Sequence, residues 1–385
     1  MRSTFLPFSP PLIGEEEIAE VVDTLQSDWI TTGPKVKHFE QAFSAFIGSP
    51  SALATSSATD AMLVGLAALG VGEGDEVITT PMTFCSTAHV IEHLGAKPIF
   101  VDVVRDTMTL DPEKIEEAIS PKTKAVLPVH LHGHPCDMDP ILELAGAHNL
   151  SVLEDAAHAF PAIYKGRKIG TLGDLTAFSF YATKNLTTGE GGMLAGSAEL
   201  VDEARIWSLH GMSRDAWNRY GETGSWYYEV IRPGFKCNMP DIQAAIGVQQ
   251  LKKIPGFQER RREIVKRYNA AFEGLDEIEL PVEKPEVRSA WHLYVIRLNL
   301  ERLKIDRSRF IEELKNRNIG TSVHFIPLHI QPYYQNKYGY TPEDYPVAYA
   351  EFQRMISLPL NLRLSDQDLD DVIEAVIDVI EKNRL

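Results

Sequence analysis

Apolar and polar positions alternate on a regular scale between about residue 52 and residue 196. Short apolar runs predict strands at 75–81, 97–103, 124–131, 151–157, 175–181 and 191–197. Segments of helical character lie between them, at 59–70, 85–95, 111–120 and 138–149. This alternation is typical of an α/β fold, in which helices cover both faces of a large, mostly parallel sheet. Ligands of such folds bind at the carboxyl ends of the strands.

The pattern changes after about residue 245, where charged helices become longer and strands fewer. The elements predicted there are helices at 258–274, 306–318 and 365–383 and strands at 291–299 and 321–328. We therefore predict two domains. The first is a large sheet domain over residues 1–245, and the second is a smaller α+β domain over residues 246–385.

Charge and composition narrow the functional class. The net charge of −16 argues against a nucleic-acid partner, because such proteins usually present a basic face. The sequence shows no signal-peptide pattern and no apolar run of membrane-spanning length. Its three cysteines, Cys85, Cys136 and Cys237, are widely spaced and predict reduced thiols rather than a disulfide framework. We expect a soluble, cytoplasmic protein.

Candidate chemistry gathers at the predicted strand ends. Asp155 lies at the end of one apolar run, Ser179 lies within the next, and Lys184 follows in "ATKNLTTGEGG". Ser57 and Thr59 begin an alanine-rich helix, whose free amides and dipole suit a phosphate. Each feature alone is common in caps, turns and solvated surfaces. An anion cradle, a carboxylate and an amine together suit pyridoxal phosphate, which needs all three.

Two other patterns in the sequence bear on metal and nucleotide binding. His130, His132 and His134 alternate in "HLHGH", which could place imidazoles on one side of a strand as metal ligands. That run enters a Gly/Pro turn and has no HExxH motif or acid cluster near it, so we predict no metal. The sequence also lacks the GxxxxGK[ST] motif of nucleotide-hydrolysing P-loops.

Several segments resemble one known family. The run from Glu154 to Gly192, "EDAAHAFPAIYKGRKIGTLGDLTAFSFYATKNLTTGEGG", closely resembles the core of the DegT/DnrJ/StrS sugar aminotransferases. Residues 28–43, 74–91, 121–134 and 234–251 are similar to other parts of that family, so the resemblance covers nearly the whole chain. It implies a fold-type I enzyme that depends on pyridoxal phosphate and acts on nucleotide-linked keto sugars.

The resemblance also implies roles for individual residues. Lys184 would be the Schiff-base lysine and the catalytic base, and Asp155 would keep the pyridine nitrogen protonated. Phosphate would be held by Ser57, Ala58 and Ser179, and the ring of Phe84 would stack on the cofactor. Asn238 would reach the phosphate across a subunit interface, which implies a homodimer with a shared active site.

One branch of the family is closer in detail. His158 stands where many members have glutamine, near the cofactor's ring hydroxyl, and this resembles the UDP-4-amino-4-deoxy-L-arabinose aminotransferases. The resemblance implies that His324, His329 and Thr31 of the N-terminal loop contact the substrate and that the amine is added at C4. The alternative for His324 and His329 is ordinary packing beside a cleft.

The sequence therefore predicts an aminotransferase that moves an amino group from L-glutamate to a nucleotide-linked keto sugar. A UDP- or dTDP-4-keto sugar is expected, for lipopolysaccharide, another surface polysaccharide or a related amino sugar. One alternative is a sugar dehydratase of the same family, although that branch carries histidine at the position of Lys184. The other is a non-catalytic sensor or regulator that binds the cofactor or a sugar nucleotide.

Overall fold

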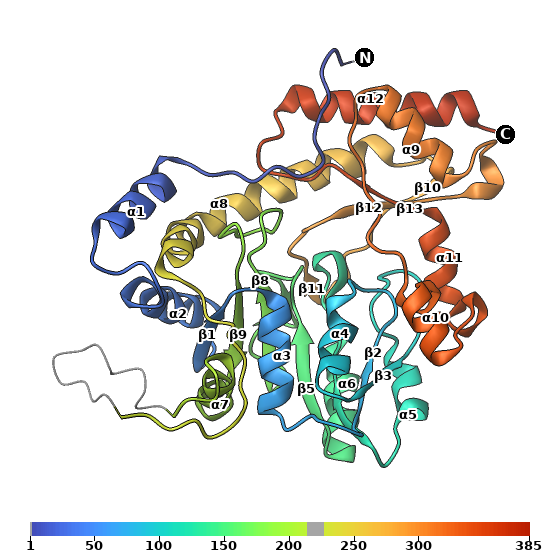
Figure 1. Ribbon diagram of the computed structural model, residues 1–385. Helices are drawn as coiled ribbons and strands as arrows, with labels where there is room; N and C mark the ends of the chain where they lie inside the picture. The colour runs from blue at the N-terminus through green and yellow to red at the C-terminus, as the bar shows by residue number, and fades with distance from the viewer. Residues whose placement is uncertain (1, 214–226) are drawn as a thin grey trace.

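A seven-stranded sheet forms the centre of the molecule in this computed structural model, which describes residues 2–213 and 227–385 (Figure 1). The strand order is β1-β9-β8-β5-β4-β2-β3. The strands are β1 Ser51–Thr55, β2 Glu76–Thr79, β3 Lys97–Phe100, β4 Thr123–Val126, β5 Ser151–Asp155, β8 Leu175–Ser179 and β9 Gly192–Gly196. Only β9 runs antiparallel to its neighbours in this sheet, so the predicted mostly parallel α/β fold is confirmed.

Helices cover both faces of this sheet, as the apolar strands require. One face packs against α2 Pro34–Ile47, α6 Met138–His148 and the first part of α8 Asp241–Phe272. The other packs against α3 Ala58–Ala68, α4 Ser86–His93 and α7 Ala198–Ser208. Because successive side chains of a strand point to opposite faces, Val152 and Leu153 of β5 belong to these two different cores.

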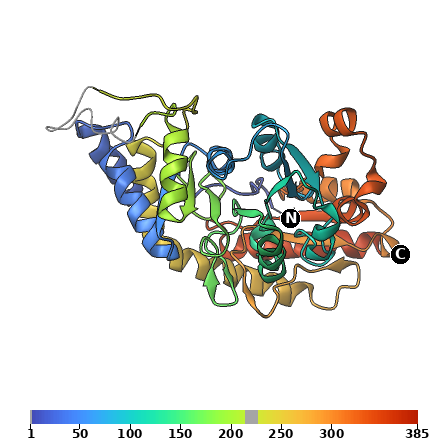
Figure 2. The same ribbon diagram turned by 90° about the horizontal axis from the view of Figure 1, so that it is seen from below.

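A smaller antiparallel sheet lies in the C-terminal part of the chain. Its order is β10-β12-β13, with β10 Ile278–Glu279, β12 Tyr294–Leu298 and β13 Met355–Leu358. It packs against the second part of α8, α9 Arg307–Asn316 and α12 Asp366–Asn383. In both views α8, coloured yellow to gold, runs from the N-terminal helices toward this sheet (Figure 1 and Figure 2). The predicted boundary at 245–246 falls within α8 and stays a prediction.

The remaining elements are short or peripheral. They are α1 Glu15–Gln26, α5 Ile115–Ala118, α10 Pro332–Tyr338, α11 Pro346–Arg354 and a third sheet of β6 Ile163–Tyr164, β7 Arg167–Lys168 and β11 Val287–Arg288. No helix among the described residues combines the length and the apolar character needed to cross a membrane.

One predicted element is wrong, and another is shorter and less regular than expected. The strand expected at 321–328 is irregular, and only Ser322 pairs with β13, through an isolated bridge to Ser357. Beyond this bridge, His324 and Phe325 line a cavity, and His324 Nδ1 lies 2.8 Å from Ser357 Oγ of β13. The helix expected at 111–120 is reduced to a 3₁₀ turn, Pro112–Lys114, followed by the single turn of α5.

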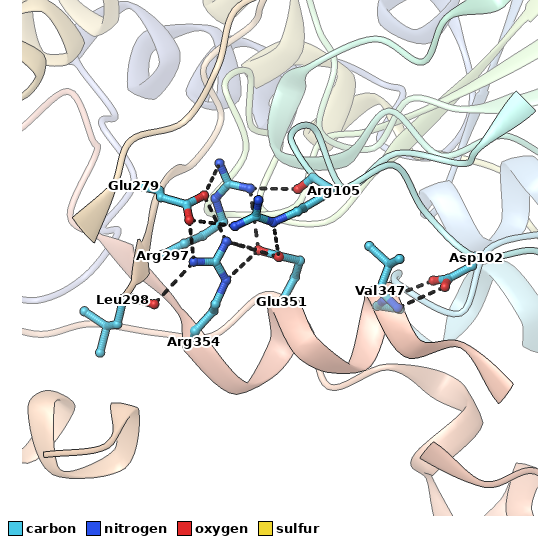
Figure 3. Close-up of polar contacts among 9 residues, drawn as sticks. Asp102, Arg105, Glu279, Arg297, Leu298, Val347, Glu351 and Arg354 are labelled. Atoms are coloured by element: carbon cyan, nitrogen blue, oxygen red, sulfur yellow. Dashed lines mark hydrogen bonds and ion pairs between the residues drawn. The ribbon is translucent and has the colours of Figure 1, made fainter. Parts of the chain in front are cut away.

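The loop that follows β3 makes several polar contacts that join the large sheet to the C-terminal part (Figure 3). The Asp102 carboxylate accepts the backbone N–H groups of Val347 (3.0 Å) and Ala348 (2.9 Å) at the start of α11, where the helix dipole favours an anion. The carbonyl of Arg105 accepts a hydrogen bond from Arg297 Nη1 of β12 (2.7 Å). The loop is thereby fixed to both α11 and β12.

We expect Phe43→Ala to lower the free energy of unfolding by about 3–5 kcal/mol, because truncating a buried aromatic ring leaves a cavity. Phe43 is fully buried on α2 and contacts the rings of Phe160, Phe178 and Phe180 within 5.0–5.5 Å. Denaturant unfolding of the cofactor-free protein measures the change. Phe46→Ala on the same helix is the control and should cost less, since Phe46 is only partly buried. Equal losses would contradict this account of the core.

Candidate active site

A cavity of about 490 Å³ opens at the carboxyl ends of the parallel strands. Five of the six parallel strands contribute: Ser57 follows β1, Thr83 follows β2, Val129 follows β4, Asp155 ends β5 and Lys184 follows β8. The C-terminal part of the chain adds His292, His324 and Phe325. The cavity therefore lies where an α/β sheet is expected to bind a ligand.

Lys184 follows β8 in a tight turn, in which its N–H donates to the Tyr181 carbonyl (2.9 Å). Its side chain is partly exposed to the cavity but is surrounded by protein. This burial lowers the pKa of Lys184 to about 8, although the nearby Asp155 raises it. A sizeable fraction of the amine is therefore unprotonated near neutral pH, as a nucleophile or a base requires.

Asp155 ends β5 and is buried beside the same cavity. Its Oδ1 accepts the Ala157 N–H (3.1 Å), and its Oδ2 accepts the Thr87 hydroxyl (2.8 Å). Burial raises the pKa of Asp155, while these two hydrogen bonds and Lys184 oppose that shift. A cationic group bound beside this carboxylate would further favour its ionised form.

An anion cradle is present at the start of α3. Ser57 is the N-cap, and Ser57, Ala58 and Thr59 line the cavity with first-turn amides that lack intrahelical acceptors. Asp60 accepts the Ser57 hydroxyl (2.9 Å), which leaves the backbone amides as the main donors for an anion. A Cβ on Gly192 of β9 would lie 2.4 Å from the Ser57 carbonyl carbon and 2.6 Å from the Ala58 nitrogen. The glycine turn in "TTGEGG" therefore allows β9 to approach the cradle, and the donor set fits a phosphate.

Neutral histidines form a third wall. His158 Nδ1 accepts the backbone N–H of His132 (3.3 Å), and the ring lies 4.5 Å from that of His292. Burial lowers the pKa of both His158 and His292 well below the usual value, and the charge of Lys184 adds to this. Because Nδ1 of His158 accepts, its proton lies on Nε2, from where it can be donated to a ligand.

Most of the residues predicted from the sequence meet at this cavity. The lining includes Ser57, Ala58, Phe84, Asp155, His158, Ser179, Lys184 and His324. Three predicted residues lie outside it. Thr31 is exposed, Asn238 pairs with Thr55 and donates to Thr32 Oγ1 (2.6 Å), and His329 is fully buried against Tyr345. A single chain therefore brings the predicted cofactor residues together, except for Asn238.

Sequence reasoning missed several contributors. Thr87 holds the Asp155 carboxylate, and His292 packs on His158 while its Nδ1 lies 3.2 Å from Asn185 Oδ1. Gly192 shapes the cradle. Hydroxyls at the start of a predicted helix were a usable signal for Thr87, but nothing in "SAWHLYV" distinguishes His292 from a core histidine.

The histidines of "HLHGH" have separate protein partners. His130 contacts Glu154 (2.8 Å), His132 contacts the His324 carbonyl (2.8 Å), and His134 contacts the Pro135 carbonyl (2.7 Å). Within residues 2–213 and 227–385, no three His, Cys, Asp or Glu side chains form a group that could hold a metal ion.

Known proteins are similar over the whole length of the chain. It is 54% identical over 382 residues to the spore coat polysaccharide biosynthesis protein SpsC of Bacillus subtilis, covering 99% of this chain and 98% of that one. It is 53% identical over 385 residues, all of both chains, to an uncharacterized protein of Methanocaldococcus jannaschii.

A solved structure, of a putative sugar aminotransferase from Streptococcus pneumoniae, is similar in fold. In its PMP form it is 40% identical, with a TM-score of 0.92, and the match covers 98% of this chain and 99% of that one. The same protein has been solved in a PLP form. Together with the cradle, the carboxylate and the amine, these structures support pyridoxal phosphate as the cofactor of this chain. The model of the DegT/DnrJ/EryC1/StrS aminotransferase family matches residues 11–377, and the chain belongs to that family.

Proposed function

We propose that this protein transfers an amino group from L-glutamate to a nucleotide-linked keto sugar, in the synthesis of a surface polysaccharide. The observation that carries the proposal is one cavity that holds an amine of lowered pKa, a buried carboxylate and a helix-start anion cradle. The name of the Bacillus subtilis relative supports a polysaccharide pathway. The name of the Streptococcus pneumoniae structure supports a sugar as acceptor.

Each part of the cavity has a distinct task. Bound pyridoxal phosphate supplies an electron sink for carbon–hydrogen bond cleavage. The amides of Ser57, Ala58 and Thr59 would hold its phosphate, and Asp155 would keep its ring nitrogen protonated. His158 would donate a hydrogen bond from Nε2 to the ring hydroxyl. Fixed donors of this kind orient the reacting atoms before the reaction begins.

Lys184 moves the proton. Its neutral amine takes the proton from the α-carbon of the donor amino acid. In the second half of the reaction it returns a proton to the sugar carbon that receives the amine. The lowered pKa of Lys184 suits both steps, because an acid–base group is most effective when its pKa lies near the working pH.

The acceptor would enter from the side formed by the C-terminal part of the chain. His324 and Phe325 line this side, and Phe325 lies 5.7 Å from the ring of Phe84. Burial lowers the pKa of His324 to about 3, so the side chain is neutral and can bind sugar hydroxyls without a charge. We propose a UDP- or dTDP-4-keto sugar with amination at C4, and contacts from Thr31 and His329 as that pocket closes.

The active unit is proposed to be a homodimer in the cytoplasm. Helix α1 buries the polar Glu17 and Thr24 against the protein and exposes the apolar Ile18, Val22 and Leu25. The exposed fractions of these three side chains are 50%, 45% and 57%, and they share one helix face. Such a contiguous apolar stripe is typical of an interface. A second copy would also supply the missing Asn238 to the cradle.

The first experiment is to record the visible absorbance of the purified holoenzyme before and after adding L-glutamate. We expect glutamate to convert the band of the lysine-bound cofactor to that of the amine form, with release of 2-oxoglutarate. A UDP- or dTDP-4-keto sugar should then restore the first band. A band that glutamate leaves unchanged would exclude glutamate as donor, and a keto sugar converted without an amino donor would indicate a dehydratase. Lys184→Ala is the control and should show neither change.

The rate at which cofactor-free enzyme takes up pyridoxal phosphate should depend on pH. Only the neutral amine of Lys184 reacts, so the rate should rise with pH and level off above about 8, where the folded-state pKa lies. An unperturbed lysine would give a rise that continues toward about 10.4. Stopped-flow absorbance measures this rate. A midpoint near 10 would contradict the burial effect assigned to Lys184.

We expect Leu25→Asp, alone or with Ile18→Asp, to dissociate the dimer, because a charge would be buried in the apolar stripe of α1. Sedimentation should show monomers, and affinity for pyridoxal phosphate should fall since each cradle loses the partner's Asn238. Leu300→Asp, at an exposed apolar position of the C-terminal part, is the control and should leave the assembly unchanged. A Leu25→Asp protein that stays dimeric would place the interface elsewhere.

A further inference from the structure

A buried carboxylate with no role in the reaction described above lies directly beside Asp155. Glu154 precedes it on β5 and is 0% exposed. Because neighbours on a strand point to opposite faces, Asp155 faces the cavity, whereas Glu154 faces the core that contains Val152. Glu154 is absent from the cavity lining, so the reaction described above gives it no task.

The carboxylate of Glu154 is held by three donors from three segments of the chain. Its Oε1 accepts the Gly173 N–H (2.9 Å) and the Thr176 hydroxyl (2.8 Å). Its Oε2 lies 2.8 Å from Nε2 of His130, which is also fully buried. A buried carboxylate without such partners would be strongly destabilising, so this set of hydrogen bonds is strictly required once Glu154 is present.

The hydrogen bonds of His130 define its tautomer. The backbone N–H of Cys136 donates to Nδ1 of His130 (3.0 Å), so Nδ1 carries no proton. The ring proton therefore lies on Nε2 and is donated to Glu154. His130 thus joins the loop after β4 to the side chain of β5.

Backbone hydrogen bonds also join the loop after β4 to Asp155 itself. The N–H of His130 donates to the Asp155 carbonyl (3.0 Å), and the N–H of Asp155 donates to the Pro128 carbonyl (2.9 Å). The end of β5 is thus fixed on both sides of Asp155: by backbone bonds to residues 128–130 and by the Glu154 side chain in the core behind it.

We propose that Glu154 and His130 are a positioning pair, which holds the end of β5 so that the Asp155 carboxylate stays directed at the ring nitrogen of the cofactor. This inference rests on the role proposed for Asp155. The geometric requirement is strict, because small displacements of a catalytic group weaken its interactions strongly. Three donors also screen the Glu154 charge, so that it does not oppose ionisation of Asp155 on the opposite face.

The test compares two cofactors in full-length protein freed of cofactor: pyridoxal phosphate and its analogue with carbon in place of the ring nitrogen. The analogue cannot use Asp155, so a loss that acts through Asp155 should appear only with pyridoxal phosphate. We expect His130→Leu to weaken pyridoxal phosphate binding about tenfold, as removal of a hydrogen bond to a charged group would. Binding of the analogue should change little. Fluorescence titration measures both dissociation constants.

Matched variants separate positioning from general damage. His134→Leu removes another buried histidine of the same loop and should affect neither cofactor. His130→Gln retains an N–H donor and should recover much of the lost affinity. Glu154→Gln keeps the shape of the side chain, removes its charge and should repeat the selective loss if His130→Leu does not fold.

Three outcomes would overturn the proposal. Equal weakening of both cofactors by His130→Leu would show that the pair has only a structural role. Unchanged binding of both cofactors would show that the pair has no role at the site. If the unaltered protein binds the two cofactors equally well, the role of Asp155 itself fails, and that result is visible before any variant is made.

Discussion

Burial at one edge of the large sheet is the constraint on which the site depends. Removing a charge from water destabilises the charged form, so the same cavity lowers the pKa of Lys184 and raises that of Asp155. The protein offsets these two effects unequally, because the Asp155 charge only partly opposes the shift of Lys184. Thr87 and the Ala157 amide donate to Asp155 and favour the carboxylate. Among residues 2–213 and 227–385, no group donates or accepts a hydrogen bond at Lys184 Nζ, so its amine keeps the reactivity that burial creates.

The apolar cores on both faces of the sheet make this burial possible. The same two-residue alternation that puts Val152 and Leu153 in different cores also separates Glu154 from Asp155. A carboxylate in each direction would be costly without partners. Glu154 and Asp155 therefore have separate donors. Those of Glu154 come from β8, from the loop before β8 and from the loop after β4. Donors from three segments fix a strand end more firmly than its backbone pairing alone.

Much of this arrangement could be predicted from sequence because it is periodic or local. Strand ends follow from apolar runs, so Asp155 and Lys184 could be assigned to one edge, and the N-cap at Ser57 has a local signature. His292 and Thr87 could not be assigned in this way, because their roles come from contacts with residues far away in the sequence. His292 contacts His158, 134 residues away, and Thr87 contacts Asp155, 68 residues away.

The strand predicted at 321–328 was wrong because His324 and Phe325 line the cavity and do not pair in a sheet. Thr31, Asn238 and His329 were assigned to the site by resemblance alone. In the single chain, none of the three lines the cavity.

The C-terminal part completes the cavity, and its attachment therefore matters to the chemistry. Arg261 of α8 is buried with no carboxylate partner in the described part of the chain, and its Nη1 donates to the carbonyls of Trp291 and Leu360 (both 3.1 Å). Burial lowers the pKa of Arg261 to about 10, which still leaves it charged at neutral pH. Burying a guanidinium is costly, and these hydrogen bonds to carbonyls offset part of that cost. The segment it holds leads directly into His292, which packs on His158. The first part of α8 packs against the large sheet, and Arg261 in its second part fixes the segment that carries His292. The positions of His158 and His292 therefore depend on the packing of both parts of the chain.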